Sequence, residues 1–150
     1  MTMKTPEGTH TIIRELMNAQ KLAVLATQKK GQPYASLVAF AATDDLKHII
    51  FFTPAKTRKF EQLSANPQVA LLINNSLNRE ADFEKAVAVT AVCHAGQAGD
   101  DEKETFMNLY SAKHPSLTEF ARNPVNAMVK LTVQRFHLVE NFQQVSTVTP

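Results

Sequence analysis

The chain has 150 residues, of which 44% are hydrophobic and 20% charged, a balance that excludes a disordered protein and suits a single domain, residues 1–150. Its formal net charge of +2 argues against a nucleic-acid coat protein, and no apolar run reaches the roughly 18 residues of a membrane span. Cys93 has no partner for an intrachain disulfide, and the amino terminus lacks an apolar signal core. We therefore expect a cytoplasmic protein with neither nucleic acid nor membrane as a partner.

Hydrophobic periodicity predicts one helix followed by three strands. The helix is expected over residues 8–20, because apolar residues recur there on one helical face. The segments 22–28, 34–43 and 48–53 are short apolar runs joined by the turn-forming sequences KKGQP and DDLK. Three strands joined by short turns predict an antiparallel meander.

The second half of the chain adds three strands and further helices. In chain order we expect a helix over 54–67, a strand over 68–75, a polar loop over 76–83, a strand over 85–96, a helix over 100–114, a helical piece over 115–124 and a strand over 127–142. The tail after this last strand either extends it or is free. Because strict βαβ alternation is missing, the pattern predicts a mainly β (α+β) fold, a six-stranded antiparallel barrel with flanking helices.

The segment T-P-A-K-T-R-K, which begins at Thr53, carries the most informative charge pattern. Lys56, Arg58 and Lys59 lie in the first turn of the expected helix, where the helix dipole is already positive. A bound phosphate would offset this repulsion and accept hydrogen bonds from Thr53, Thr57 and the free backbone N–H groups. The alternative is a basic helix face whose long side chains extend into water.

A longer pattern around this segment resembles the pyridoxamine 5′-phosphate oxidase-like family of FMN-binding split barrels. The pattern is T-x-x-x-T-R-K-x-x-x-x-L-x-x-N-P-x-V, preceded by G-Q-P-Y-A-S-L-V and followed later by N-L-Y-S-A-K-H-P. The resemblance covers about residues 12–140. The matching residues in the central block are Thr53, Thr57, Arg58, Lys59, Leu63, Asn66, Pro67 and Val69.

The resemblance implies a cofactor, an assembly and a set of site residues. FMN is the expected cofactor, and a homodimer is expected in which both chains line each flavin site. Arg58 and Lys59 are expected to bind the FMN phosphate with help from Thr53 and Thr57. The strand backbone expected beside the isoalloxazine ring is that of Ser36, Leu37, Val38 and Ala39.

Departures from the family pattern concern the substrate side. Ser36 aligns with an arginine of the family oxidases, Ala86 aligns with a glutamine, and the chain has no tryptophan where the oxidases carry one near their end. Vitamin B6 substrates are therefore not expected, while the phosphate block is intact. We expect an FMN-dependent oxidoreductase in which the flavin does the redox chemistry, and no catalytic side chain is assigned.

Two alternatives share the same sequence features. One is a flavin- or heme-binding protein for carriage, storage or stress response, with His114 or His137 as heme ligands. The other is a deazaflavin-dependent reductase, whose cofactor has a similar ring and phosphate. A metal site is not expected, because His94 and Cys93 are adjacent in a strand and point to opposite faces. Cys93 itself is expected to be a small buried hydrophobic residue.

Overall fold

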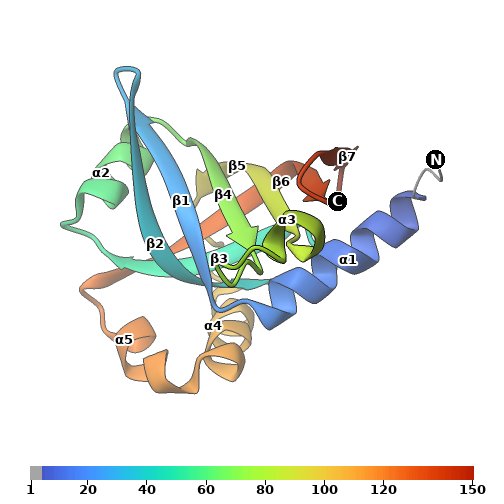
Figure 1. The fold of residues 1–150 in the computed structure, drawn as a ribbon. Helices are drawn as coiled ribbons and strands as arrows, with labels where there is room; N and C mark the ends of the chain where they lie inside the picture. Colours follow the sequence, from blue (N-terminus) through green and yellow to red (C-terminus); the bar gives the residue numbers. More distant parts are fainter. Residues whose placement is uncertain (1–4) are drawn as a thin grey trace.

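The computed structural model describes residues 5–150, and its first element is helix α1 (Pro6–Ala19) (Figure 1). The helix begins at Thr5, whose side chain accepts the backbone N–H of Gly8 at 3.1 Å, and Pro6 occupies the first helical position. The helix therefore starts two residues earlier than predicted. No helix among the described residues is long and apolar enough to cross a membrane.

In the part of the chain that the structure describes, seven antiparallel strands form the body of the fold. Their bounds are β1 (Leu22–Lys29), β2 (Gln32–Ala42), β3 (His48–Pro54), β4 (Gln68–Asn74), β5 (Ala88–Gly96), β6 (Asn126–Glu140) and β7 (Gln144–Val148). They are ordered β3-β2-β1-β4-β5-β6-β7, and an additional pairing between β3 and β6 closes the first six into a barrel. The predicted six-stranded antiparallel barrel is confirmed, with β7 added outside it.

The barrel is split along one edge of β2. This strand pairs with β1 over its length, from Lys29 opposite Gln32 to Leu22 opposite Ala39. It pairs with β3 only at residues 40–42. Among the described residues, the edge of 32–39 that faces away from β1 has no partner strand, so this edge is available to another molecule.

Helices α2 and α4 are shorter than the sequence predicts, and one further helix was not expected. The helix predicted over 54–67 is α2 (Arg58–Ala65), and the one predicted over 100–114 is α4 (Lys103–Lys113). Pro115–Leu117 forms a short 3-10 turn before α5 (Thr118–Arg122). The unexpected helix, α3 (Asp82–Lys85), begins within the predicted polar loop 76–83 and ends at the first residue of the predicted strand, and β5 begins three residues later than expected.

The tail after β6 was expected either to extend that strand or to be free. Instead it folds back onto the barrel as β7. Asn141 and Phe142 have φ angles of 50° and 64°, and these left-handed residues reverse the chain after β6. β7 then pairs with the second half of β6, from Glu140 opposite Gln144 to Phe136 opposite Val148.

Two apolar cores hold these elements. The larger fills the barrel and includes the fully buried Leu25, Phe40 and Phe136. The smaller lies where α4 and α5 cover β2 and β3, around Phe52 and Tyr110, whose rings meet edge to face at 4.9 Å. Burial raises the pKa of the Cys93 thiol to about 12, which confirms the prediction of a buried hydrophobic residue and leaves no thiolate for nucleophilic chemistry.

Candidate functional site

The two threonines of the predicted phosphate segment meet at the start of α2. Thr57 is the N-cap: its side chain accepts the backbone N–H of Phe60 at 3.3 Å and donates to the carbonyl of Pro54 at 2.9 Å. Thr53 is buried at the end of β3, and its hydroxyl oxygen lies 3.1 Å from that of Thr57. The cap therefore links the end of the strand to the first turn of the helix.

Two of the three predicted cations lie in the first turn of α2. Arg58 and Lys59 are its first two residues, so their backbone N–H groups have no intrahelical acceptor. Within residues 5–150 neither side chain forms an ion pair with a carboxylate. The nearby Glu61 pairs with Lys29, and this hydrogen bond lowers the pKa of the Glu61 carboxyl. Lys56 precedes the cap, so its expected place inside the helix is wrong.

Contacts with β1 and β2 fix the position of α2. The guanidinium of Arg58 lies 5.4 Å from the ring centroid of Tyr34, on β2, at cation–π distance. The buried side chain of Gln62 accepts a hydrogen bond from the Thr27 hydroxyl at 2.7 Å. The basic first turn therefore lies beside the first half of β2, the part of the strand with the free edge.

The predicted ring-side segment, residues 36–39, lies on that same strand. Val38 is buried in the barrel core, whereas the side chain of Leu37 is 64% exposed. The buried Ser36 hydroxyl has no hydrogen-bond partner among the described residues. Ser36 and Tyr34 are two residues apart in β2, so their side chains point to the same face of the sheet. The Ser36 hydroxyl therefore lies next along the strand from the Tyr34 ring that Arg58 contacts.

Helix α4 holds the end of this segment through contacts that the sequence analysis missed. The Tyr110 hydroxyl donates to the carbonyl of Ala39 at 3.3 Å, and Nε2 of His114 lies 2.7 Å from the carbonyl oxygen of Phe40. The spacing of Tyr110 and His114 by four residues placed them on one helical face, which was the available signal. Burial raises the pKa of Tyr110 to about 12 and lowers the pKa of His114, so both groups are uncharged at neutral pH.

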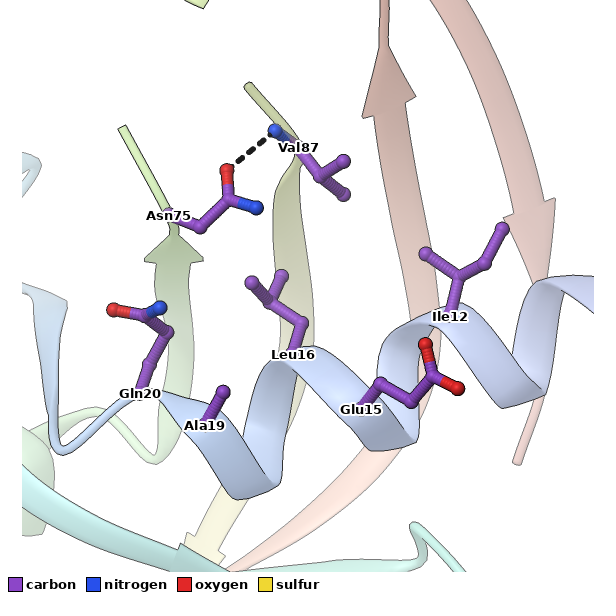
Figure 2. A pocket seen from close by; sticks show the side chains of 7 residues that line it. All are labelled: Ile12, Glu15, Leu16, Ala19, Gln20, Asn75 and Val87. Carbon is purple, nitrogen blue, oxygen red and sulfur yellow. Dashed lines mark hydrogen bonds between the residues drawn. The ribbon is translucent and has the colours of Figure 1, made fainter. Parts of the chain in front are cut away.

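A cavity elsewhere in the fold contains none of the predicted site residues. It has a volume of about 230 Å³ and lies between α1 and the ends of β4 and β5 (Figure 2). Leu16 and Val87 contribute apolar surface, and the Asn75 side chain at its edge accepts the backbone N–H of Val87 at 2.8 Å. The basic turn of α2 and the free edge of β2 therefore remain the candidate site.

Comparison with known proteins supplies the family. The sequence profile of the pyridoxamine 5′-phosphate oxidase family matches residues 10–140. The chain belongs to the pyridoxamine 5′-phosphate oxidase family. A pyridoxine/pyridoxamine 5′-phosphate oxidase from Granulibacter bethesdensis is 38% identical in an alignment of 78 positions that covers 48% of this chain and 36% of that protein. The match thus spans about a third of that relative's length.

Solved structures show the same fold. A heme-binding protein from Mycobacterium smegmatis has a TM-score of 0.84 at 15% identity, over 99% of this chain and 60% of that chain. An FAD-binding protein from Mesorhizobium loti has a TM-score of 0.68 at 17% identity, over 85% of this chain and 90% of that chain. At these identities the comparison concerns the fold alone.

In this member of the pyridoxamine 5′-phosphate oxidase family, the two histidines weighed as heme ligands are engaged by protein groups. His114 is 5% exposed and bound to the Phe40 carbonyl. The Nε2 atom of His137 accepts from Arg135 at 3.2 Å, and its Nδ1 lies 2.9 Å from the Thr147 hydroxyl. Heme ligation by either histidine would require these bonds to break. The described residues contain no cluster of three potential metal ligands.

Replacing Thr57 by alanine is expected to lower the free energy of unfolding by about 1–3 kcal/mol. The change removes the N-cap of α2 and leaves the buried Thr53 hydroxyl without this partner. Urea unfolding measures the effect, and Thr11→Ala is the control, because Thr11 is an exposed helical threonine whose hydroxyl bonds only to the Glu7 carbonyl. Equal midpoints for the two variants would contradict a structural role for the cap.

Lys113 is expected to make stability rise with pH on the alkaline side. Its ammonium donates to the Met17 carbonyl at 2.7 Å and lies 3.8 Å from the Phe40 ring centroid, and burial lowers the pKa of Lys113 from 10.5 to about 8. Between these two values the unfolded chain binds the proton and the folded chain does not, so the free energy of unfolding rises with pH.

Lys113→Met should remove this rise. Other groups, among them the Cys93 thiol of the unfolded chain, also titrate in this range. The quantity to compare is therefore the difference in the free energy of unfolding between wild type and variant, measured in urea from pH 7 to pH 10. A difference that stays constant over that range would contradict the depressed pKa.

Proposed function

We propose that the chain is one FMN-binding domain that holds the cofactor phosphate at the start of α2. The observation that carries the proposal is the joint presence of a hydroxyl pair, two free N–H groups and two cations without carboxylate partners at one helix terminus. A phosphate dianion needs several donors and positive charge at once. Arg58 and Lys59 would hold the phosphate through their charges and free N–H groups. The Thr57 and Thr53 hydroxyls, which bond to the Pro54 carbonyl and to each other, would join them by exchanging those bonds for bonds to the phosphate.

The isoalloxazine ring is proposed to lie along the free edge of β2. Among the described residues this edge pairs with no strand before residue 40, Tyr110 binds only its Ala39 carbonyl, and the Ser36 hydroxyl is uncommitted. Tyr110 and His114 bind the carbonyls of Ala39 and Phe40, so the strand is positioned before a ligand arrives. FMN, when bound, supplies hydride or electron transfer, and the chain's residues anchor and orient it.

We further propose an FMN-dependent oxidoreductase that does not use vitamin B6 substrates. The arginine and the glutamine that the family oxidases carry are replaced here by Ser36 and Ala86, and the chain has no tryptophan. No side chain is given a catalytic role, because none in the site has the environment of a general acid or base. The substrate is therefore expected to lack the phosphate and pyridine groups that those missing side chains would recognise.

A homodimer is proposed through the outer face of β1, β2 and β4. Leu22, Leu37 and Leu72 stand exposed on these adjacent strands. Beside them is a cavity of about 370 Å³, whose lining includes the small side chains of Ala26 and Ala70. Exposed leucines next to a hollow lined in part by alanine make a surface that two identical copies related by a two-fold axis can bury together.

Titration with cofactors tests the proposal directly. Visible absorption and flavin fluorescence should show saturable one-to-one binding of FMN per chain, with weaker or no binding of hemin. A deazaflavin mononucleotide serves as the competing cofactor, and reduction of the bound flavin by NADH or NADPH separates an oxidoreductase from a carrier. Tight hemin binding without FMN binding would overturn the proposal.

A further inference from the structure

A buried hydrogen bond joins α2 to β1 beside the basic first turn of the helix. The Thr27 hydroxyl donates to the side-chain oxygen of Gln62 at 2.7 Å, and the two residues are 3% and 7% exposed. An apolar pair of the same shape at these positions would stabilise the fold about as well, because the net contribution of one hydrogen bond is small. What the polar pair adds is direction, since a hydrogen bond restricts both distance and angle whereas apolar contact is non-directional.

The contacts of Gln62 and Arg58 hold α2 at two points on one pair of strand residues. These side chains are four residues apart, so they lie one above the other on the same face of the helix. The Arg58 guanidinium lies 5.4 Å from the Tyr34 ring centroid, and Gln62 accepts from Thr27. Thr27 and Tyr34 are directly opposite each other in the β1–β2 ladder. The first two turns of the helix are therefore aligned with a single cross-strand pair.

The strand pair that receives α2 is itself fixed in register. Lys30 and Gly31 connect β1 to β2, and their φ angles of 51° and 80° are those of a two-residue hairpin turn. Such a turn sets which residues face each other across the hairpin. From Tyr34 the same strand runs on to residues 36–39, the proposed ring-side segment. Alignment of α2 with the pair of Thr27 and Tyr34 therefore also aligns the basic turn with that segment.

Another side-chain link between α2 and β1 lies on the surface. Lys29 pairs with Glu61, but their side chains are 43% and 62% exposed. Exposed ion pairs contribute little to stability and are screened by salt, so this pair holds α2 only loosely. The alignment of the helix therefore depends mainly on the buried bond between Gln62 and Thr27.

We propose that Gln62 is a positioning residue whose hydrogen bond to Thr27 orients the first turn of α2 toward residues 36–39 and thereby sets the preference of the site for a phosphorylated flavin. The inference rests on the phosphate site proposed above. Gln62 lies one turn beyond Arg58 and acts by placing it, without a contact to the phosphate of its own. Charge-assisted hydrogen bonds depend on distance and angle, so a helix displaced by about 1 Å would leave ring binding as before and weaken phosphate binding.

The ratio of the dissociation constants for riboflavin and FMN tests this role on the full chain. Thr27→Val and Gln62→Met each remove the hydrogen bond while keeping a side chain of similar size, and each should lower the ratio about tenfold. Riboflavin affinity itself should change less than about threefold, because the ring lies against β2. Changing both residues should lower the ratio no further than either change alone, since the two side chains share one bond.

Two control variants separate positioning from stability. Thr27→Ser keeps the hydroxyl and should keep the wild-type ratio. Ile73→Val removes a methylene from a fully buried side chain near the far end of β4, so it should lower the urea unfolding midpoint without changing the ratio. All titrations are made where far-UV circular dichroism shows each variant to be folded.

The result for wild type keeps this inference apart from the phosphate site itself. A wild-type ratio close to one removes the phosphate site, and with it any role for Gln62. A high wild-type ratio that is unchanged in Gln62→Met and Thr27→Val overturns only the positioning role, even where both variants unfold at lower urea. An equal fall in Ile73→Val would also overturn it, because loss of stability alone would then explain the change.

Discussion

Replacing Arg58 and Lys59 together by alanine is expected to weaken FMN binding on the order of a hundred-fold or more. Within residues 5–150 neither side chain forms an ion pair with a carboxylate, and both lie in the first turn of α2, so each is available to a phosphate. Two charge-assisted hydrogen bonds would be lost together with their share of the positive field. Flavin fluorescence titration of the variant measures the change in dissociation constant.

The matched control for this variant is Lys56→Ala. Lys56 belongs to the same basic segment but precedes the Thr57 cap and is exposed, so its removal should change FMN affinity by only a few fold. Loss of affinity in both variants to the same extent would point to a general charge effect. Unchanged affinity in the double variant would show that the phosphate binds elsewhere.

Introducing glutamate at Leu37 and Leu72 is expected to convert the proposed homodimer into a monomer. Both leucines are exposed in the single chain, on the outer face of β1, β2 and β4. In the proposed dimer this face is covered, so a carboxylate there would be buried without a partner. An uncompensated buried charge costs several kcal/mol, so the dimer dissociation constant should rise more than about a hundred-fold. Analytical ultracentrifugation over a concentration series measures this constant.

Leu77→Glu is the control for the dimer variants, because Leu77 is an exposed leucine in the loop between β4 and α3. This variant should keep the wild-type sedimentation coefficient. FMN affinity should fall in the Leu37→Glu/Leu72→Glu variant, since the family resemblance implies that both chains line each site. A wild-type chain that sediments as a monomer at all concentrations would remove the two-chain site from the account.

The strands of the barrel could be predicted from the sequence because local signals agree there. The first three apolar runs, each bounded by turn residues, match β1, β2 and β3 to within two residues at each end. The closure of the barrel depends on pairing between β3 and β6, which lie far apart in the sequence. The sequence analysis inferred a closed barrel from strand number and topology rules but did not predict which strands close it, and a split barrel was expected only from the family resemblance.

Helix starts were predicted less well, for a physical reason. The start of α2 depends on which residue caps it, and Thr57 is identified as the cap by its bond to the Phe60 N–H. The sequence analysis had placed the start of this helix four residues earlier, at Pro54, because proline is common at helix starts. Likewise α3 is held by the Asp82 carboxylate, which binds backbone groups of the preceding loop, and hydrophobic periodicity does not report such bonds.

Parts of the candidate site arise only from tertiary contacts. The Arg58–Tyr34 and Gln62–Thr27 contacts bring α2 against β1 and β2, and nothing in the local sequence around these residues indicates their partners. The same holds for Tyr110 and His114, which bind carbonyls of β2. The residues expected to bind phosphate were predictable because their chemistry is concentrated in one short segment.

Comparing FMN with riboflavin on the wild-type chain tests the central claim most directly. The two ligands share the ring system and differ in the phosphate, so their affinity ratio isolates the contribution of the basic turn of α2. The account predicts that FMN binds on the order of a hundred-fold more tightly than riboflavin, with the ratio falling close to one in Arg58→Ala/Lys59→Ala. Equal affinity of the wild-type chain for both ligands would contradict a phosphate site at the start of α2.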